Sequence, residues 1–138
     1  MQAKALVKYF YEQVFSQNLL AEVEHYVAAD CVFRLGTQMF PVGIEGMKQH
    51  IIDVRKTYPD LKITVLNQFI DGDFVISEVV AEGTHLGEFM NIAPTGKKLV
   101  LTGIDIDKVC NGKIVEHCGA VNTFETFMQA GIIRPHNG

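Results

Sequence analysis

Acidic and histidine side chains in the second half of the chain are the residues whose types could support proton-transfer chemistry. Asp105 lies in the middle of a Val/Ile-rich segment, and His85 follows a segment in which every second residue is small or apolar. A carboxylate and an imidazole that face one cavity can move a proton at a carbon beside a carbonyl group. Asp105 is thus either a cavity acid or an exposed strand carboxylate. His85 is either a cavity base or a buried histidine that holds the following loop.

Two further polar residues have equally open roles. Tyr11 lies on a helix rich in aromatic residues, where packing is the default and a place in a site is the alternative. Asn122 is either a pocket amide or the N-cap of a helix, because Asn122-Thr123-Phe124-Glu125 places a Glu at the third helical position. The five histidines lack metal-ligand spacing, and no Gly-rich phosphate loop or nucleophile elbow occurs. We therefore expect neither a metal nor a cofactor.

Length and composition predict a single domain over residues 1–138. The hydrophobic fraction of 48% and the charged fraction of 20% are those of a globular protein. No apolar run approaches the roughly 20 residues that a membrane span needs, and polar residues interrupt any signal-peptide core at the N-terminus. We therefore expect a cytoplasmic protein that does not enter a membrane.

Charge and cysteine usage exclude further classes. The net charge of −4 and the pI near 5.7 argue against a nucleic-acid partner, because phosphate binding needs clustered Lys and Arg. Cys31, Cys110 and Cys118 form an odd set without a Cys-x-x-Cys motif. We interpret them as reduced packing residues.

The hydrophobic period changes from helical to strand-like after Pro59, which indicates an α+β domain. Helices on one face of a curved antiparallel sheet would satisfy this order. We expect a loop over residues 36–43. The expected helices span residues 2–17, 19–27, 43–58 and 123–130, and the expected strands span residues 31–35, 61–70, 74–84, 98–109 and 114–121.

Asn111-Gly112 is a strong signal for a two-residue hairpin loop. With that loop, Cys110 faces Lys113 and the residue numbers of each cross-strand pair sum to 223. Asp105 then lies opposite Cys118, and both share a face with Asn122. The same register turns His117 to the other face, where we expect an interface or packing role.

Four short motifs together carry a family resemblance. In them the chain resembles the SnoaL-like polyketide cyclase group of the NTF2-like superfamily. The resemblance implies a cone-shaped α+β barrel, in which a curved antiparallel sheet wraps around helices and encloses an apolar cavity. It also implies a homodimer, no metal or nucleotide, and aldol ring closure of polyketides by an Asp acid/base. The motifs are Gly83-Thr84-His85-Leu86-Gly87-Glu88-Phe89, Pro94-Thr95-Gly96-Lys97, Gly103-Ile104-Asp105 and Gly112-Lys113-Ile114-Val115-Glu116-His117.

The chain departs from this pattern at two positions. Asn122 stands where the resemblance places the ring-closing Asp, and Cys118 replaces the usual Trp. A more distant resemblance, to ketosteroid isomerase, places Asp105 and Tyr11 at two oxyanion hydrogen-bond donors and puts Phe40 at the position of the general base. Asp105 would have to stay protonated for that role, which an apolar pocket favours.

Two functions remain open at this point. The first is a cofactor-independent cyclase or isomerase that acts on a small hydrophobic carbonyl compound. Its catalytic residues would be Asp105, His85 and Tyr11, with ligand contacts from Asn122, Cys118 and Phe40. The second is a non-catalytic module that binds a small hydrophobic molecule or serves dimer assembly.

Overall fold

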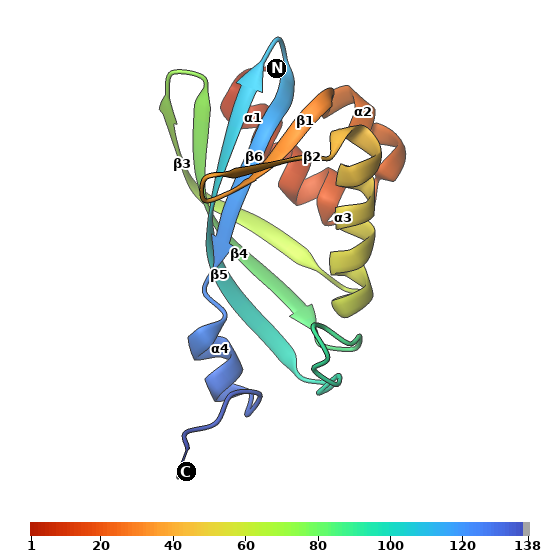
Figure 1. Cartoon of the computed structure of the whole chain (residues 1–138), viewed down its shortest axis with the longest axis vertical. Coiled ribbons are helices and arrows are strands. Elements are labelled where there is room, and N and C mark those ends of the chain that lie inside the picture. Colours follow the sequence, from red (N-terminus) through yellow and green to blue (C-terminus); the bar gives the residue numbers. More distant parts are fainter. Residues whose placement is uncertain (137–138) are drawn as a thin grey trace.

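A computed structural model describes residues 1–136 of the chain. It confirms the α+β class: a six-stranded curved sheet with the order β2-β1-β6-β5-β4-β3 carries helices against its strands (Figure 1). The sheet does not close, and β2 and β3 form its edges. The elements are α1 (Ala3–Tyr9), η1 (Phe10–Phe15), η2 (Leu20–Glu22), α2 (Val23–Tyr26), β1 (Val27–Leu35), β2 (Gln38–Pro41), α3 (Gly43–Thr57), β3 (Lys62–Asp71), β4 (Phe74–Thr84), β5 (Lys98–Cys110), β6 (Lys113–Val121) and α4 (Phe124–Gln129).

The sheet differs from the prediction in two ways. Part of the loop expected over residues 36–43 is instead the edge strand β2, which pairs with β1. In addition, β1 pairs with β6 in parallel, so the sheet is mixed and not wholly antiparallel. A hairpin turn forces neighbouring strands to be antiparallel, but β1 and β6 are joined through most of the chain, and so long a connection permits either direction.

The first predicted helix forms, but its hydrogen bonding changes part-way. After α1 the chain continues as the π-helix η1, in which the Ser16 amide donates to the Tyr11 carbonyl at 3.2 Å. The buried side chains of this segment are Phe10, Tyr11, Val14 and Phe15. Single turns of π-helix occur often at functional sites.

The main core lies between these helices and the sheet face that they cover, which we call the inner face. Met47 and Ile51 of α3 are fully buried there, together with Val75 of β4. Fully burying an apolar side chain of this kind contributes about 1.5–3 kcal/mol. A second, smaller cluster forms farther along β5, where α4 covers Leu99 and Leu101 through Phe127 and Ala130. No helix within residues 1–136 is long and apolar enough to cross a membrane.

A β-bulge at Val115 changes which side chains of β6 face inward. Next to the hairpin loop the predicted pairing holds, with Cys110 opposite Lys113. Beyond Val115 the pairing slips by one residue, so that Asp107 lies opposite His117 and Asp105 opposite Gly119. A slip of one residue exchanges the two faces of a strand. The predicted pairing of Asp105 with Cys118 is therefore wrong, and His117 joins the inner face.

Candidate functional site

A buried cluster of Tyr11, Asp107 and His117 joins η1, β5 and β6 on the inner face. Asp107 has no exposed surface. The Tyr11 hydroxyl donates to one oxygen of this carboxylate, and His117 Nδ1 lies 2.7 Å from the other. The Tyr11 hydroxyl and His117 Nδ1 are themselves 3.3 Å apart. Asp107 therefore fixes both the phenol and the imidazole ring.

The electrostatics of this cluster favour a charged histidine. Burial lowers the pKa of His117, but the charge of Asp107, its hydrogen bond and the charge of Asp105 outweigh burial and leave the pKa raised. Burial and the charge of Asp107 raise the pKa of Tyr11 well above its ordinary value, so the phenol stays protonated. With Nδ1 donating to Asp107, the second ring nitrogen of His117, Nε2, is the one that can serve a ligand.

Asp105 lies two residues before Asp107 on the same face but in a different environment. Burial and the nearby Asp107 charge raise the pKa of Asp105 to about 6, although the charge of His117 acts in the opposite direction. No hydrogen bond from the described residues contributes to this balance. At pH 7 the carboxylate is thus mostly ionised and lacks a fixed donor, which suits it to accept a proton.

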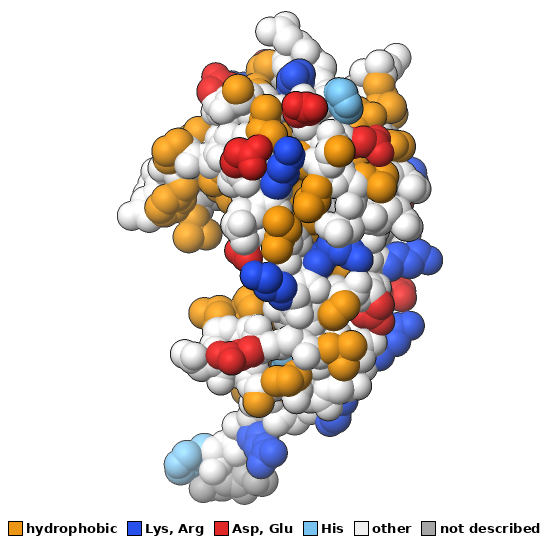
Figure 2. Space-filling view, turned by 90° about the vertical axis from the view of Figure 1, so that its right-hand side faces the viewer, with side chains coloured by type: hydrophobic (Ala, Val, Ile, Leu, Met, Phe, Trp, Pro, Cys, Tyr) orange, Lys and Arg blue, Asp and Glu red, His pale blue; other side chains and the backbone are white. Residues whose placement is uncertain are grey.

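The surroundings of Asp105 leave it between the two apolar clusters. Along the inner face of β5, Leu99 and Leu101 belong to the cluster under α4, whereas Gly103 and Asp105 are half-buried. Gly103 and Gly119 contribute no side chains there. The molecular outline is hollowed on one side (Figure 2).

Aromatic rings from two other elements lie beside His117. The Phe33 ring of β1 has its centroid 5.3 Å from the His117 ring and 5.2 Å from the His50 ring of α3. Burial and the charge of His117 lower the pKa of His50 to about 4. His50 is therefore a neutral imidazole, and it lies on the other side of Phe33 from His117, whose pKa is raised.

Comparison with known proteins decides the family. A family model described as SnoaL-like polyketide cyclase matches residues 5–130. The chain belongs to this family. Among solved structures, IdmH from Streptomyces antibioticus, a candidate polyketide cyclase, is 29% identical with a TM-score of 0.81, over 95% of this chain and 99% of that one. No curated protein matches the sequence significantly.

Two less similar solved structures share the fold alone. AclR from Streptomyces galilaeus, a candidate hydroxylase, is 24% identical with a TM-score of 0.78 and covers 95% of this chain and 96% of that one. A candidate polyketide cyclase from Acidithiobacillus ferrooxidans is 17% identical with a TM-score of 0.81 and covers 97% of this chain and 100% of its own.

His85 does not meet Asp105 in this SnoaL-like chain. It is 2% exposed, and its Nδ1 accepts the Thr95 amide at 3.3 Å and lies 3.1 Å from the Thr95 hydroxyl. Asp105 of β5 pairs with Ser77 of β4. His85 comes eight residues after Ser77, which separates it from the Asp105 position by on the order of 26 Å along an extended chain. Of the two predicted roles, the structure gives His85 that of a buried histidine that holds the following loop.

The predicted ligand contacts fall on different faces. Cys118 lies on the outer face, where its sulfur accepts a hydrogen bond from Arg34 Nη2 at 3.0 Å. Asn122 is exposed and lines a hollow of about 350 Å³ with Thr102 and Ile104 of the same face. Phe40 is paired with Phe33 and hence lies on the inner face, near the sheet edge. The prediction that Asp105, Cys118 and Asn122 share one pocket is therefore wrong, because the bulge separates them.

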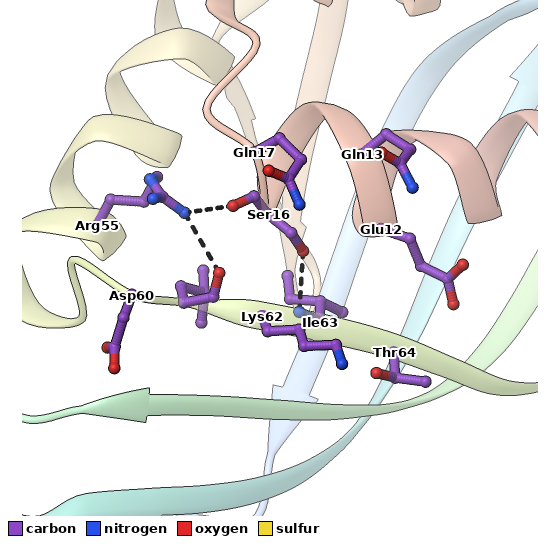
Figure 3. Close-up of a pocket in the computed structure, with 10 residues that line it drawn as sticks. Glu12, Gln13, Ser16, Gln17, Arg55, Asp60, Lys62, Ile63 and Thr64 are labelled. Atoms are coloured by element: carbon purple, nitrogen blue, oxygen red, sulfur yellow. Dashed lines mark hydrogen bonds between the residues drawn. The ribbon is translucent and has the colours of Figure 1, made fainter.

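A second hollow, of about 490 Å³, lies between η1, α3 and β3 and is lined mostly by polar residues (Figure 3). Arg55 donates to the Ser16 carbonyl at 2.7 Å across it. The Ser16 hydroxyl donates to the Tyr11 carbonyl at 2.8 Å and accepts the Ile63 amide at 2.9 Å. These contacts hold the π-helix that carries Tyr11 against β3. Asp105 lines neither hollow, so the internal cavity stays a prediction.

Four residues in and beside the buried cluster were not predicted as site residues from the sequence. Asp107 and His117 form the centre, and Phe33 and His50 lie beside them. His117 ends a motif of the family resemblance, which was an available signal. Residues 1–136 hold no group of three His, Cys, Asp or Glu side chains arranged to bind a metal ion.

Proposed function

We propose that this SnoaL-like protein is a cofactor-independent cyclase or isomerase that moves a proton at a carbon beside a carbonyl group of a small hydrophobic molecule. The observation that carries the proposal is the arrangement of two acidic residues on one strand. Asp107 is fully buried and bonded to Tyr11 and His117, whereas Asp105 has a pKa of about 6 and no fixed donor. Two carboxylates with such different environments suit two different roles.

In the proposed mechanism Asp105 is the base. It takes a proton from the carbon beside the carbonyl group, and the electrons of the broken C–H bond move onto the carbonyl oxygen. His117 Nε2–H donates a hydrogen bond to this developing oxyanion, while Asp107 and Tyr11 hold the ring. In ring closure the enolate carbon attacks a second carbonyl carbon, the first C=O bond re-forms, and the π electrons of the second carbonyl move onto its oxygen, which takes the proton from Asp105. In isomerisation of a substrate with an adjacent C=C bond, the conjugated enolate takes the same proton from Asp105 at the far carbon of that bond, so the double bond shifts. General bases contribute about 10²–10⁴-fold and oxyanion donors about 10²–10³-fold.

This mechanism differs from the sequence prediction in two roles: Asp105 is the base and not the hydrogen-bond donor, and His117 is the donor. A protonated Asp105 could donate to the carbonyl oxygen, but a pKa of about 6 leaves the carboxylate ionised at pH 7. His117 supplies the donor, because its pKa is raised and its ring is fixed by Asp107. His85, which the structure does not bring to Asp105, has no part in the proposed reaction.

The proposal is tested by turnover and by carbon-bound proton exchange in deuterated water, with small cyclic ketones and polyketide-like diketones as probes. Asp105→Asn is expected to reduce kcat at least 100-fold, because an amide cannot accept the proton. Asp71→Asn is the matched control, since Asp71 is an exposed carboxylate at the end of β3. Turnover that is unchanged in Asp105→Asn would remove this mechanism.

A second candidate function is a non-catalytic binding module for a small hydrophobic molecule. Asn122 favours it, because this amide stands where the resemblance places a ring-closing Asp. A binding module would take up apolar fluorescent probes in a saturable way, and binding would survive Asp105→Asn. Exchange of carbon-bound protons that depends on Asp105 would exclude it.

We also propose that two copies of the chain pair through the outer face of the sheet. Exposed apolar side chains gather there, including Phe69 of β3, which is 63% exposed, and Ile104 of β5, which is 46% exposed. Exposed apolar side chains that gather on one face of a sheet favour an interaction site there. The homodimer that the family resemblance implies is the partner we assign to this face.

A further inference from the structure

Gly119 lies directly beneath the Asp105 carboxylate. The two residues are cross-strand partners of β5 and β6. A Cβ atom added to Gly119 would lie 2.0 Å from Asp105 Oδ1 and 3.2 Å from its Cγ. The first distance leaves no room for a methyl group and the second is tight, so the Asp105 carboxylate would have to shift to admit a side chain at position 119.

The backbone gives no reason for a glycine here. Six glycines in residues 1–136 adopt positive φ angles, and Gly119 is not one of them. An alanine could therefore adopt the same backbone conformation. Glycine within a strand also weakens the strand, and often marks a point where another group approaches the backbone closely. At Gly119 the structure identifies that group as the Asp105 carboxylate.

We propose that Gly119 is a positioning residue, whose missing side chain lets the Asp105 carboxylate lie against β6 on the inner face. This inference rests on the proposed function only for the role of Asp105 as the base. The charged and titratable groups around the carboxylate are Asp107 on its own strand, His117 on β6 and Tyr11 on η1, with His50 of α3 beyond His117. A side chain at position 119 would move the carboxylate away from this set.

The first test uses NMR titration of the side-chain carboxyl groups in the whole chain, and needs no substrate. In Gly119→Ala the titration midpoint of Asp105 is expected to fall from about 6 toward the ordinary value of 3.8, because the displaced carboxylate regains water. Gly103→Ala is the matched control. It adds a methyl group on β5, two residues before Asp105, 3.1 Å from the Ala120 carbonyl oxygen and 3.4 Å from Val79, and none of the three atoms nearest to this methyl group belongs to Asp105. In Gly103→Ala the titration midpoint of the Asp105 carboxyl group is expected to match that of the wild type.

The second test is a double-mutant cycle on thermal stability. At pH 3.5, where Asp105 is largely uncharged and the steric conflict alone counts, Gly119→Ala is expected to lower the midpoint of unfolding in the wild type. The same change is expected to be neutral or to raise the midpoint in an Asp105→Ala background, because the obstructing carboxylate is gone and alanine suits a strand better than glycine. An equal effect in both backgrounds, with an unmoved Asp105 titration, would overturn the inference.

The outcomes separate this inference from the proposed function. Unchanged turnover in Asp105→Asn would remove the catalytic proposal, and both substrate-free tests would still decide the role of Gly119. If the catalytic proposal holds, Gly119→Ala is expected to lower kcat more than it changes KM. The acid limb of the plot of kcat against pH is expected to shift to lower pH. Gly103→Ala is expected to leave that limb in place.

Discussion

Replacing Asp105 with Asn is expected to stabilise the protein at neutral pH. The folded state raises the pKa of this carboxyl from 3.8 to about 6. Folding therefore favours the protonated form, and an ionised Asp105 opposes folding. An amide of the same shape carries no charge at any pH, so Asp105→Asn removes the unfavourable contribution.

The magnitude follows from the shift in pKa. A shift of about 2 pH units corresponds to about 3 kcal/mol at 1.36 kcal/mol per unit. This value is an upper limit because Asp105 is only half-buried and water screens part of its charge. For a chain of this length, 3 kcal/mol would raise the midpoint of thermal unfolding by roughly 10 °C.

The stabilisation is expected to depend on pH. Above pH 6 Asp105 is ionised in both the folded and the unfolded state, and the advantage of Asp105→Asn is complete. As the pH falls through 6 toward 3.8, the folded wild type takes up a proton and gains stability relative to the variant. Below both values the carboxyl group is neutral in each state and the difference disappears.

Thermal unfolding followed by circular dichroism at pH 7.5 and pH 3.5 measures the difference. Asp107→Asn is the matched control on the same strand and face. It is expected to destabilise the protein by roughly 3–5 kcal/mol at neutral pH, because the buried His117 and Tyr11 lose the carboxylate to which both are hydrogen-bonded. Destabilisation of similar size by both variants at pH 7.5 would refute the distinction between the two carboxylates.

Two further predictions concern the inner and outer faces. Tyr11→Phe is expected to reduce the free energy of unfolding by roughly 1–3 kcal/mol in urea denaturation, because the buried Asp107 oxygen loses its phenol donor; an unchanged midpoint would contradict that hydrogen bond. Ile104→Glu is expected to convert a dimer into a monomer in sedimentation velocity, because it places a charge on the apolar outer face, whereas Asp71→Asn should leave the dimer intact. A monomeric wild type would exclude the proposed assembly.

Most of the elements were predictable because they have a local signal in the sequence. The stripe of Met47, Ile51 and Val54 predicts α3, and Asn111-Gly112 predicts the hairpin between β5 and β6. The short edge strand β2 and the π-helix η1 escaped prediction. Gly and Pro around residues 36–43 suggest only a loop, and the change from α to π hydrogen bonding keeps the same apolar face.

The site was harder to predict because a single residue decides its composition. Val115 is a β-branched residue in a strand-like run, and nothing in the local sequence marks it as a bulge. A register extended from the hairpin loop without that bulge assigns Cys118 and Asn122 to the face of Asp105 and removes His117. The true pairing depends on contacts with β1 and η1 that lie far away in the sequence.

The period of the strand explains why one carboxylate stays reactive. Asp105 and Asp107 are two residues apart, so the pleat of β5 directs both to the inner face. The bulge presents one histidine to this pair, and its Nδ1 bonds to Asp107, which also receives the Tyr11 hydroxyl. Asp105 faces Gly119 in place of a donor. The same geometry that satisfies Asp107 thus leaves Asp105 with a raised pKa, and the energetic cost of that burial is what keeps the carboxylate ready to take a proton.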